Sequence, residues 1–147
     1  AVSGEEQEAV SEIPMKVLDL FCGAGGASVG LEEAEAEVVL AVDSWDDACR
    51  TYKMNHKDTE VVCADLMEME KFPSVDMVWA SPPCPDFSYA NRGNQDVERG
   101  MKMVRRTLEI IGKVKPKWWV IENVPPLVKF QAPLVEISVI YGSIGAL

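Results

Sequence analysis

The chain has little of what a metal site or a disulfide framework needs. Its 147 residues include a single histidine, His56, and no two of its cysteines have the C-x-x-C spacing. The four cysteines are widely separated in the sequence, and His56 has no second potential ligand beside it. We therefore expect no metal cofactor and no disulfide scaffold, and a reducing cytoplasmic environment is the default.

Long apolar runs, internal repeats and positive charge are also scarce. The apolar runs span only a few residues, too few to cross a membrane, and the acidic N-terminus lacks the basic start of a signal peptide. With 24 acidic and 14 basic residues the net charge is −10, which disfavours a grip on a phosphate backbone by this chain alone. Either the charge serves only solubility, or such a grip resides in another segment or polypeptide. Basic residues gather locally at Arg92, Arg99, Lys102, Arg105, Arg106, Lys113, Lys115 and Lys117.

What the chain does contain is typical of one globular domain. Apolar residues make up 48% and charged residues 26% of the sequence, enough for a sizeable core. Residues 1–14 are acidic and without periodicity, so we expect a disordered or artificial tail there. Residues 15–147 then form the folded domain.

Short apolar runs alternate with amphipathic segments along that domain. Strands are expected at residues 16–20, 38–42, 61–63, 75–80 and 118–121, and helices at 28–37, 45–55 and 97–114. Asp43 or Ser44 is the expected N-cap of the second helix, and Met101, Val104, Leu108 and Ile111 line one face of the third. Residues 86–96 resemble a mobile loop, and 134–141 a further strand. This alternation predicts an α/β fold with a mostly parallel sheet and ligands at the carboxyl ends of its strands.

A glycine cluster follows the first expected strand. Asp19 ends the strand, and Gly23, Gly25 and Gly26 allow a tight turn beneath a ligand before the helix. Ser28 stands where the dinucleotide fingerprint would need glycine, so that motif is absent.

Acidic and aromatic residues follow the next two strands. Asp43 is placed to hold a ribose hydroxyl pair, Trp45 to stack on a purine ring, and Asp65 to accept a hydrogen bond from an exocyclic amine. The alternative is a tight turn with ordinary solvated acids.

Cys84 directly follows the fourth strand in a frame of prolines. Pro82, Pro83 and Pro85 have fixed φ and stiffen the loop, as accurate placement of a nucleophilic sulfur requires. A lone cysteine is more often a small buried hydrophobe, which is what we expect of the other three, Cys22, Cys49 and Cys63.

Glu122 follows the apolar fifth strand and precedes Asn123, Val124 and two prolines. Burial against the strand would raise the pKa of its carboxyl group. A solvated strand-end glutamate is the alternative.

Together these segments resemble the DNA cytosine-5 methyltransferase family over about residues 16–126. The family's D-x-F-x-G-x-G-G motif with a further glycine matches Asp19, Phe21, Gly23, Gly25, Gly26 and Gly30. Its Pro-Cys motif matches Pro83, Cys84, Phe87 and Ser88, and its Glu-Asn-Val motif matches Glu122, Asn123 and Val124. Pro85 departs from the glutamine that is usual in the family, which affects base entry rather than the nucleophile.

The resemblance implies a Rossmann-like S-adenosylmethionine-dependent methyltransferase fold that is truncated at its C-terminus. It implies S-adenosylmethionine as the methyl donor, double-stranded DNA with an extruded cytosine as substrate, and roles in bacterial restriction–modification, near the nucleoid in a prokaryote. Catalysis would fall to Cys84, which adds to cytosine C6, and to Glu122. The cofactor would contact Asp19, Phe21, Gly23, Gly25, Gly26, Asp43, Ser44, Trp45, Asp65, Leu66 and Pro82. The substrate would contact Pro83, Phe87, Ser88, Asn123 and Val124.

The later parts of the family pattern do not match. The sequence has no Gln-x-Arg-x-Arg segment, no target-recognition domain and no returning C-terminal helix, so we expect no robust DNA methylation by this chain alone. A subunit completed by a second polypeptide, a fragment, and a degenerate cofactor-binding scaffold are three interpretations that stay open. RNA cytosine methylation remains an alternative activity, whereas nicotinamide-dependent redox chemistry is disfavoured by Ser28 and by the pair Cys84 and Glu122.

Overall fold

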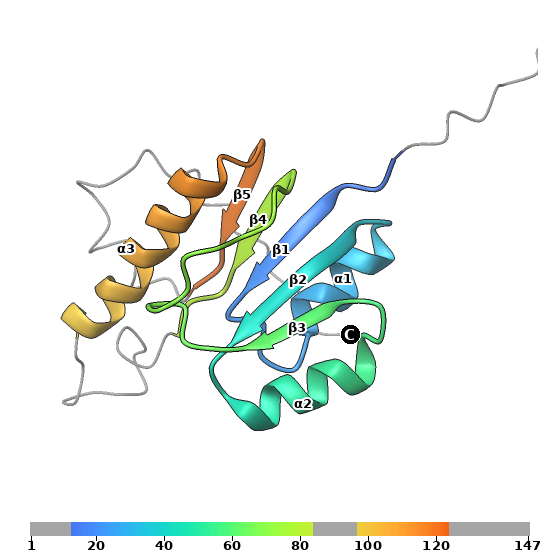
Figure 1. Ribbon diagram of the computed structural model, residues 1–147, viewed down its shortest axis with the longest axis horizontal. Coiled ribbons are helices and arrows are strands. Elements are labelled where there is room, and N and C mark those ends of the chain that lie inside the picture. Colours follow the sequence, from blue (N-terminus) through green and yellow to red (C-terminus); the bar gives the residue numbers. More distant parts are fainter. Residues whose placement is uncertain (1–12, 84–96, 124–147) are drawn as a thin grey trace, which may run out of the picture.

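The computed structural model describes residues 13–83 and 97–123, and within them five strands form one parallel sheet (Figure 1). The strands are β1 (Lys16–Leu20), β2 (Glu37–Asp43), β3 (Glu60–Cys63), β4 (Met77–Ala80) and β5 (Trp118–Ile121). Their order across the sheet is β3-β2-β1-β4-β5, and every neighbouring pair is parallel. The predicted parallel α/β sheet is confirmed.

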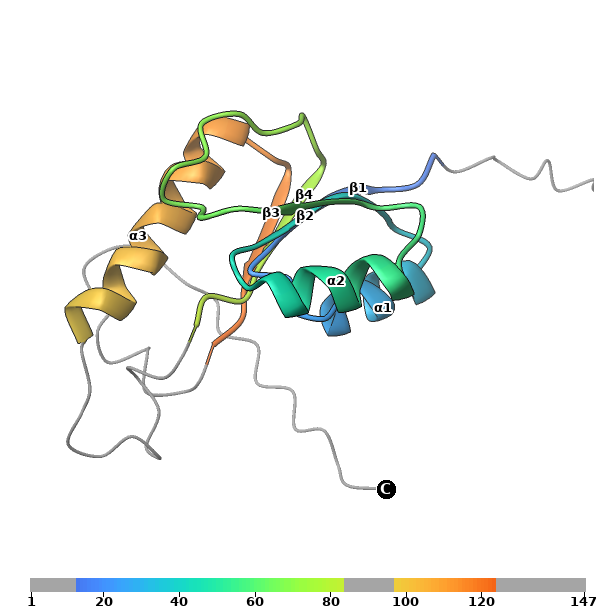
Figure 2. The same cartoon turned by 60° about the horizontal axis from the view of Figure 1, so that its bottom comes forward.

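Three helices cover the two faces of this sheet. Helices α1 (Gly26–Glu33) and α2 (Asp46–Asn55) lie on one side, and α3 (Val97–Val114) lies on the other (Figure 2). The larger core cluster joins the strands to Ile110 of α3, with Leu18, Leu20 and Val78 fully buried. Tyr52 of α2, also fully buried, packs with Ala41 on the opposite face.

The predicted elements agree closely with these bounds, apart from the first two helices. The first helix begins at Gly26 and ends at Glu33, instead of spanning residues 28–37, and β2 already begins at Glu37. The N-cap residue of α2 is Trp45, which makes no side-chain cap bond, so the expected capping by Asp43 or Ser44 is wrong.

Successive strands are added to the sheet in two directions, on one side of β1 and then on the other. Strands β1 to β3 progress toward one edge, and the chain then returns to place β4 and β5 on the other side of β1. The loops after β1 and β4 therefore diverge at the carboxyl edge, where ligands bind in open parallel sheets. No helix in residues 13–83 or 97–123 is long and apolar enough to cross a membrane. The expected loop at 86–96 and strand at 134–141 lie outside the described residues.

Candidate functional site at the carboxyl edge of the sheet

The glycine loop after β1 is built from left-handed backbone. Phe21, Gly23 and Gly25 have φ values of 57°, 54° and 101°, conformations that glycine adopts at little cost and other residues rarely adopt. The Gly25 amide donates to the Cys22 carbonyl at 3.0 Å, which closes the turn before α1 begins at Gly26. The predicted tight turn at the end of the first strand is confirmed.

Asp43 connects this loop to the exit of β2. Its Oδ2 accepts the Gly23 amide at 2.9 Å and its Oδ1 accepts the Trp45 amide at 2.9 Å. Its backbone carbonyl accepts the Ala64 amide at 2.9 Å, which adds the exit of β3. One half-buried residue thus holds together the three loops that carry most of the predicted cofactor residues.

The side chains around Asp43 differ in exposure. Ser44 and Asp65 are exposed, and Trp45 is 66% exposed, so these residues are accessible to a ligand. Leu66 is buried in the core cluster, so only its backbone remains for binding.

Asp19 is completely buried beneath the loop. Its Oδ2 accepts the Ser28 hydroxyl at 2.6 Å, and Ser28 Oγ lies 2.6 Å from the Tyr52 hydroxyl oxygen. Desolvation raises the pKa of Asp19 to about 6, although the hydrogen bond from Ser28 opposes the shift. The carboxyl group supports the loop from below, an arrangement that the motif did not reveal.

The exits of β4 and β5 are joined to each other. The Asn123 side-chain amide donates to the Pro82 carbonyl at 2.9 Å, and the Glu122 amide donates to the Ala80 carbonyl at 2.8 Å. Pro82 is buried and Pro83 exposed. The Glu122 side chain is exposed, so the burial expected from the preceding apolar strand is not observed. The predicted site residues Cys84, Phe87, Ser88 and Val124 lie outside the described residues.

Two of the other cysteines are the buried small residues that the sequence predicted. Desolvation raises the pKa of the Cys49 thiol to about 12, and burial raises that of Cys22 well above its usual range. Both therefore stay protonated and are poor nucleophiles. Cys63 is exposed, so the expectation of burial is wrong for this residue, which ends β3 at the site edge.

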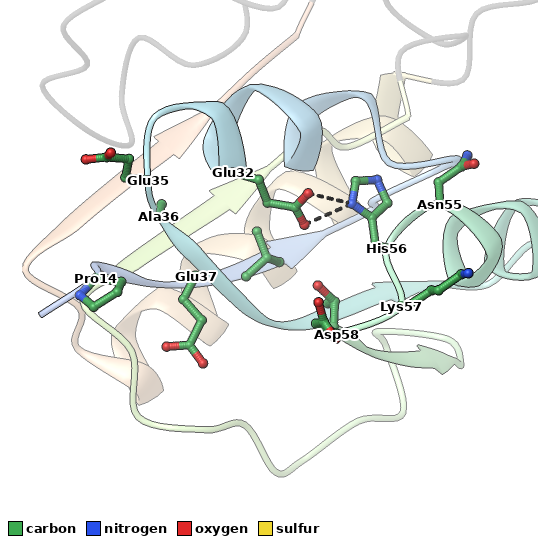
Figure 3. A pocket seen from close by; sticks show the side chains of 11 residues that line it. Pro14, Glu32, Glu35, Ala36, Glu37, Asn55, His56, Lys57 and Asp58 are labelled. Carbon is green, nitrogen blue, oxygen red and sulfur yellow. Dashed lines mark hydrogen bonds and ion pairs between the residues drawn. The ribbon is translucent and has the colours of Figure 1, made fainter.

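A cavity of about 350 Å³ lies elsewhere, at the amino end of the sheet (Figure 3). Its lining includes the start of β2, the ends of α1 and α2, and the pair formed by Glu32 and His56. None of the predicted site residues that the structure describes lines it, and its acidic walls, with Glu35, Glu37 and Asp58, suit no anionic ligand.

Sequence reasoning missed several supporting residues. Tyr52 and His56 lie under the glycine loop, and Arg106, assigned from sequence to a local basic cluster, is only 6% exposed. Arg106 donates to the carbonyl groups of Leu66 and Met69 behind Asp65. The sequence around Arg106 does not predict its burial, although the buried residues Val104 and Thr107 place it beside the buried face of α3.

Solved structures support the same architecture. A prophage-encoded protein from E. coli superposes with a TM-score of 0.68 at 23% identity, covering 81% of this chain and 34% of that one. The Dnmt2 methyltransferase of S. pombe superposes with a TM-score of 0.58, also at 23% identity, covering 81% and 36%. At this level of identity the likeness concerns the fold, which is that of methyltransferase structures.

Sequence comparison is more specific. The chain is 36% identical over 115 residues to the Type II methyltransferase M.HgiGI of Herpetosiphon aurantiacus, covering 75% of this chain and 90% of that protein. It is 36% identical over 122 residues to the Type II methyltransferase M.HindV of Haemophilus influenzae, but spans only 39% of it. The family model for C-5 cytosine-specific DNA methylases matches residues 15–140. The chain therefore belongs to the C-5 cytosine-specific DNA methylase family.

Proposed function

We propose that this chain is the cofactor-binding and nucleophile-bearing part of a DNA cytosine-5 methyltransferase. It would transfer a methyl group from S-adenosylmethionine to C5 of cytosine through a covalent bond between Cys84 and C6. The hydrogen bond from Asn123 to Pro82 carries the proposal. It ties the backbone two residues before Cys84 to the strand exit that bears Glu122, and so favours joint action of the two groups on one base.

The edge formed by β1, β2 and β3 fits the proposed cofactor. A Cβ atom on Gly23 or Gly26 would meet nothing within 4 Å, so open space adjoins the loop backbone. The Asp43 carboxylate oxygens each accept one amide and retain a free lone pair for a ribose hydroxyl. The exposed Trp45 indole and Asp65 carboxylate suit an adenine ring and its amine. When bound there, S-adenosylmethionine would supply an electrophilic methyl group for C5.

The residues of this chain would prepare the base to accept that group. The Cys84 thiolate adds to C6, forming an S–C6 bond and moving the ring electron pair toward C5. The Glu122 carboxyl group, donating a hydrogen bond to cytosine N3 and accepting one from the amino group, offsets the negative charge that develops on the ring. After methylation, C5 releases its proton to solvent and the S–C6 bond breaks, which restores the aromatic ring and frees Cys84.

The target base must leave the duplex to reach the sulfur. The net charge of −10 opposes a strong grip on the phosphate backbone by this chain. We propose that target recognition comes from polypeptide outside this sequence, either a second chain or a further segment. Turnover on duplex DNA by the 147-residue chain alone should then be at most weak.

Covalent trapping tests the proposal. A duplex containing 5-fluorocytosine, incubated with the chain, S-adenosylmethionine and candidate partner proteins, should form an adduct that peptide mass spectrometry places on Cys84. Fluorine at C5 cannot leave as a proton does, so the S–C6 bond persists. Cys84→Ala should abolish the adduct, whereas Cys63→Ser, which removes an exposed thiol outside the proposed chemistry, should retain it. An RNA duplex of the same sequence is the comparison substrate.

The cofactor half of the proposal has its own measurement. Calorimetry should show binding of S-adenosylhomocysteine and none of NAD. Tighter binding of NAD would contradict the proposed cofactor. Cofactor binding without an adduct under any condition would instead favour a scaffold that has lost catalysis.

A further inference from the structure

Arg106 is a buried cation on the inner side of α3. Burying a guanidinium group is costly unless its donors find partners, and here all three nitrogens do. Nε donates to the Leu66 carbonyl at 2.8 Å, Nη1 donates to Glu109 Oε2 at 3.1 Å, and Nη2 donates to the Met69 carbonyl. Two of these partners belong to the loop after β3, about 40 residues earlier in the chain.

That loop has little regular structure of its own. The Asp65 carboxylate accepts the Met67 amide at 2.8 Å, and the Asp65 carbonyl accepts the Glu68 amide at 3.0 Å, forming a tight turn. The turn is anchored by the buried Leu66 side chain on one side and by Arg106 on the other. Charge-assisted bonds such as these are stronger than neutral ones.

A single peptide unit connects Arg106 to Asp65. The Leu66 carbonyl that accepts Arg106 Nε belongs to the same planar peptide as the Met67 amide that donates to Asp65 Oδ1. Because the peptide is planar, fixing the carbonyl also fixes the direction of the N–H. The N–H in turn holds one oxygen of Asp65, and the exposed carboxylate is left with Oδ2 for a ligand.

We propose that Arg106 is a positioning residue for recognition of the adenine amine. It acts through the Leu66–Met67 peptide to hold the Asp65 carboxylate in the orientation that accepts the 6-amino group of the cofactor. The inference rests on the proposed function, since it assumes that S-adenosylmethionine binds at this edge. Arg106 itself touches no ligand.

The test compares two ligands by calorimetry on the full chain: S-adenosylhomocysteine and its analogue with hydrogen in place of the 6-amino group. The wild type should bind S-adenosylhomocysteine about tenfold more tightly, as expected for a hydrogen bond to a charged group. Arg106→Met should lose most of this preference while binding the analogue nearly unchanged. Asp65→Asn should lose it as well, and the double variant should lose no more than either single variant.

Arg105→Met is the matched control. Arg105 is adjacent in sequence and of the same type, but it is half exposed and pairs with Glu98 on its own helix. This variant should keep the full preference. A purely structural role for Arg106 would weaken both ligands equally, and that result, or an unchanged preference in Arg106→Met, would overturn the inference.

Two further outcomes are distinguishable. If Arg106→Met does not fold, Arg106→Lys replaces it under the same criterion, because an ammonium group keeps the charge but cannot hold both carbonyl groups in the fixed fork geometry. If the wild type binds neither ligand, the proposed cofactor is contradicted and this inference with it. If the wild type binds both with equal affinity, only the inference is contradicted.

Discussion

Substitution of Gly25 by alanine tests how the glycine loop is supported. Gly25 has a φ of 101°, and a Cβ atom there would lie 2.3 Å from Nε2 and 2.6 Å from Cδ2 of the His56 ring. The ring cannot easily withdraw. It is 5% exposed, its centroid lies 4.4 Å from that of the Tyr52 ring, and its Nδ1–H donates to the Glu32 carboxylate at 2.9 Å.

Two costs therefore combine in Gly25→Ala. The left-handed backbone costs a residue with a Cβ atom about 1–2 kcal/mol, and overpacking against a rigid ring adds about 1–3 kcal/mol. We expect the free energy of unfolding to fall by roughly 2–5 kcal/mol, a large part of the stability of a domain of this size. Urea denaturation followed by circular dichroism measures the change.

Gly30→Ala is the matched control, because Gly30 lies inside α1 and its added Cβ would meet nothing within 4 Å. Alanine there should stabilise the protein, by up to about 1 kcal/mol. In a His56→Ala background the contact with the imidazole ring is lost and only the 3.0 Å contact with Tyr52 Cδ2 remains. Gly25→Ala should then cost little more than the backbone term of about 1–2 kcal/mol. A change below about 0.5 kcal/mol in the wild-type background would refute the reasoning, since surface substitutions stay within that range.

Two further predictions concern Asp19 and Trp45. Burial raises the pKa of Asp19 from 3.8 to about 6, so the folded state binds the proton more tightly than the unfolded state and stability falls as pH rises from about 4 to about 6. Relative to Asp19→Asn, the wild-type free energy of unfolding should drop by about 2–3 kcal/mol between pH 4 and pH 6.5, measured by urea titration; no difference in slope would contradict the shift. Trp45→Ala should weaken S-adenosylhomocysteine binding by about tenfold, as loss of a stacked aromatic ring implies, without lowering the melting temperature. Trp118→Ala, which removes a comparably exposed indole at the start of β5, should leave the affinity unchanged.

The sequence was sufficient to predict the strands and the third helix, because apolar periodicity and flanking glycines and prolines mark the ends of these elements. It was not sufficient to predict where α1 ends. Glu35 adopts a φ of 62°, and the Ala36 amide bonds back to the Leu31 carbonyl at 3.0 Å, a helix stop usually made with glycine. With glutamate in that place, no residue type signalled the stop.

For the candidate site, too, the sequence predicted some features and not others. The motifs predicted which loops form the candidate site, and the structure brings the loops carrying Gly23, Asp43 and Ala64 together through Asp43. They did not identify what lies beneath those loops, since a buried arginine or histidine has the same letter as an exposed one. Arg106 was grouped with a local cluster of basic residues for that reason, and only its burial separates it from Arg105.

Ser28 departs from the dinucleotide fingerprint, but its hydroxyl group is needed for the hydrogen bonds beneath the glycine loop. From the sequence it only excluded the dinucleotide fingerprint, whose third glycine permits close packing of helix and strand. In the structure its hydroxyl is fully buried and links Asp19 to the Tyr52 hydroxyl, at 2.6 Å on each side. Glycine at this position would leave the Asp19 carboxyl group without the Ser28 hydrogen bond that opposes its desolvation. Asp19 near the end of β1 and Ser28, nine residues later, therefore act together: their hydrogen bond holds the first turn of α1 against the strand. The glycine loop between them stays open to a ligand.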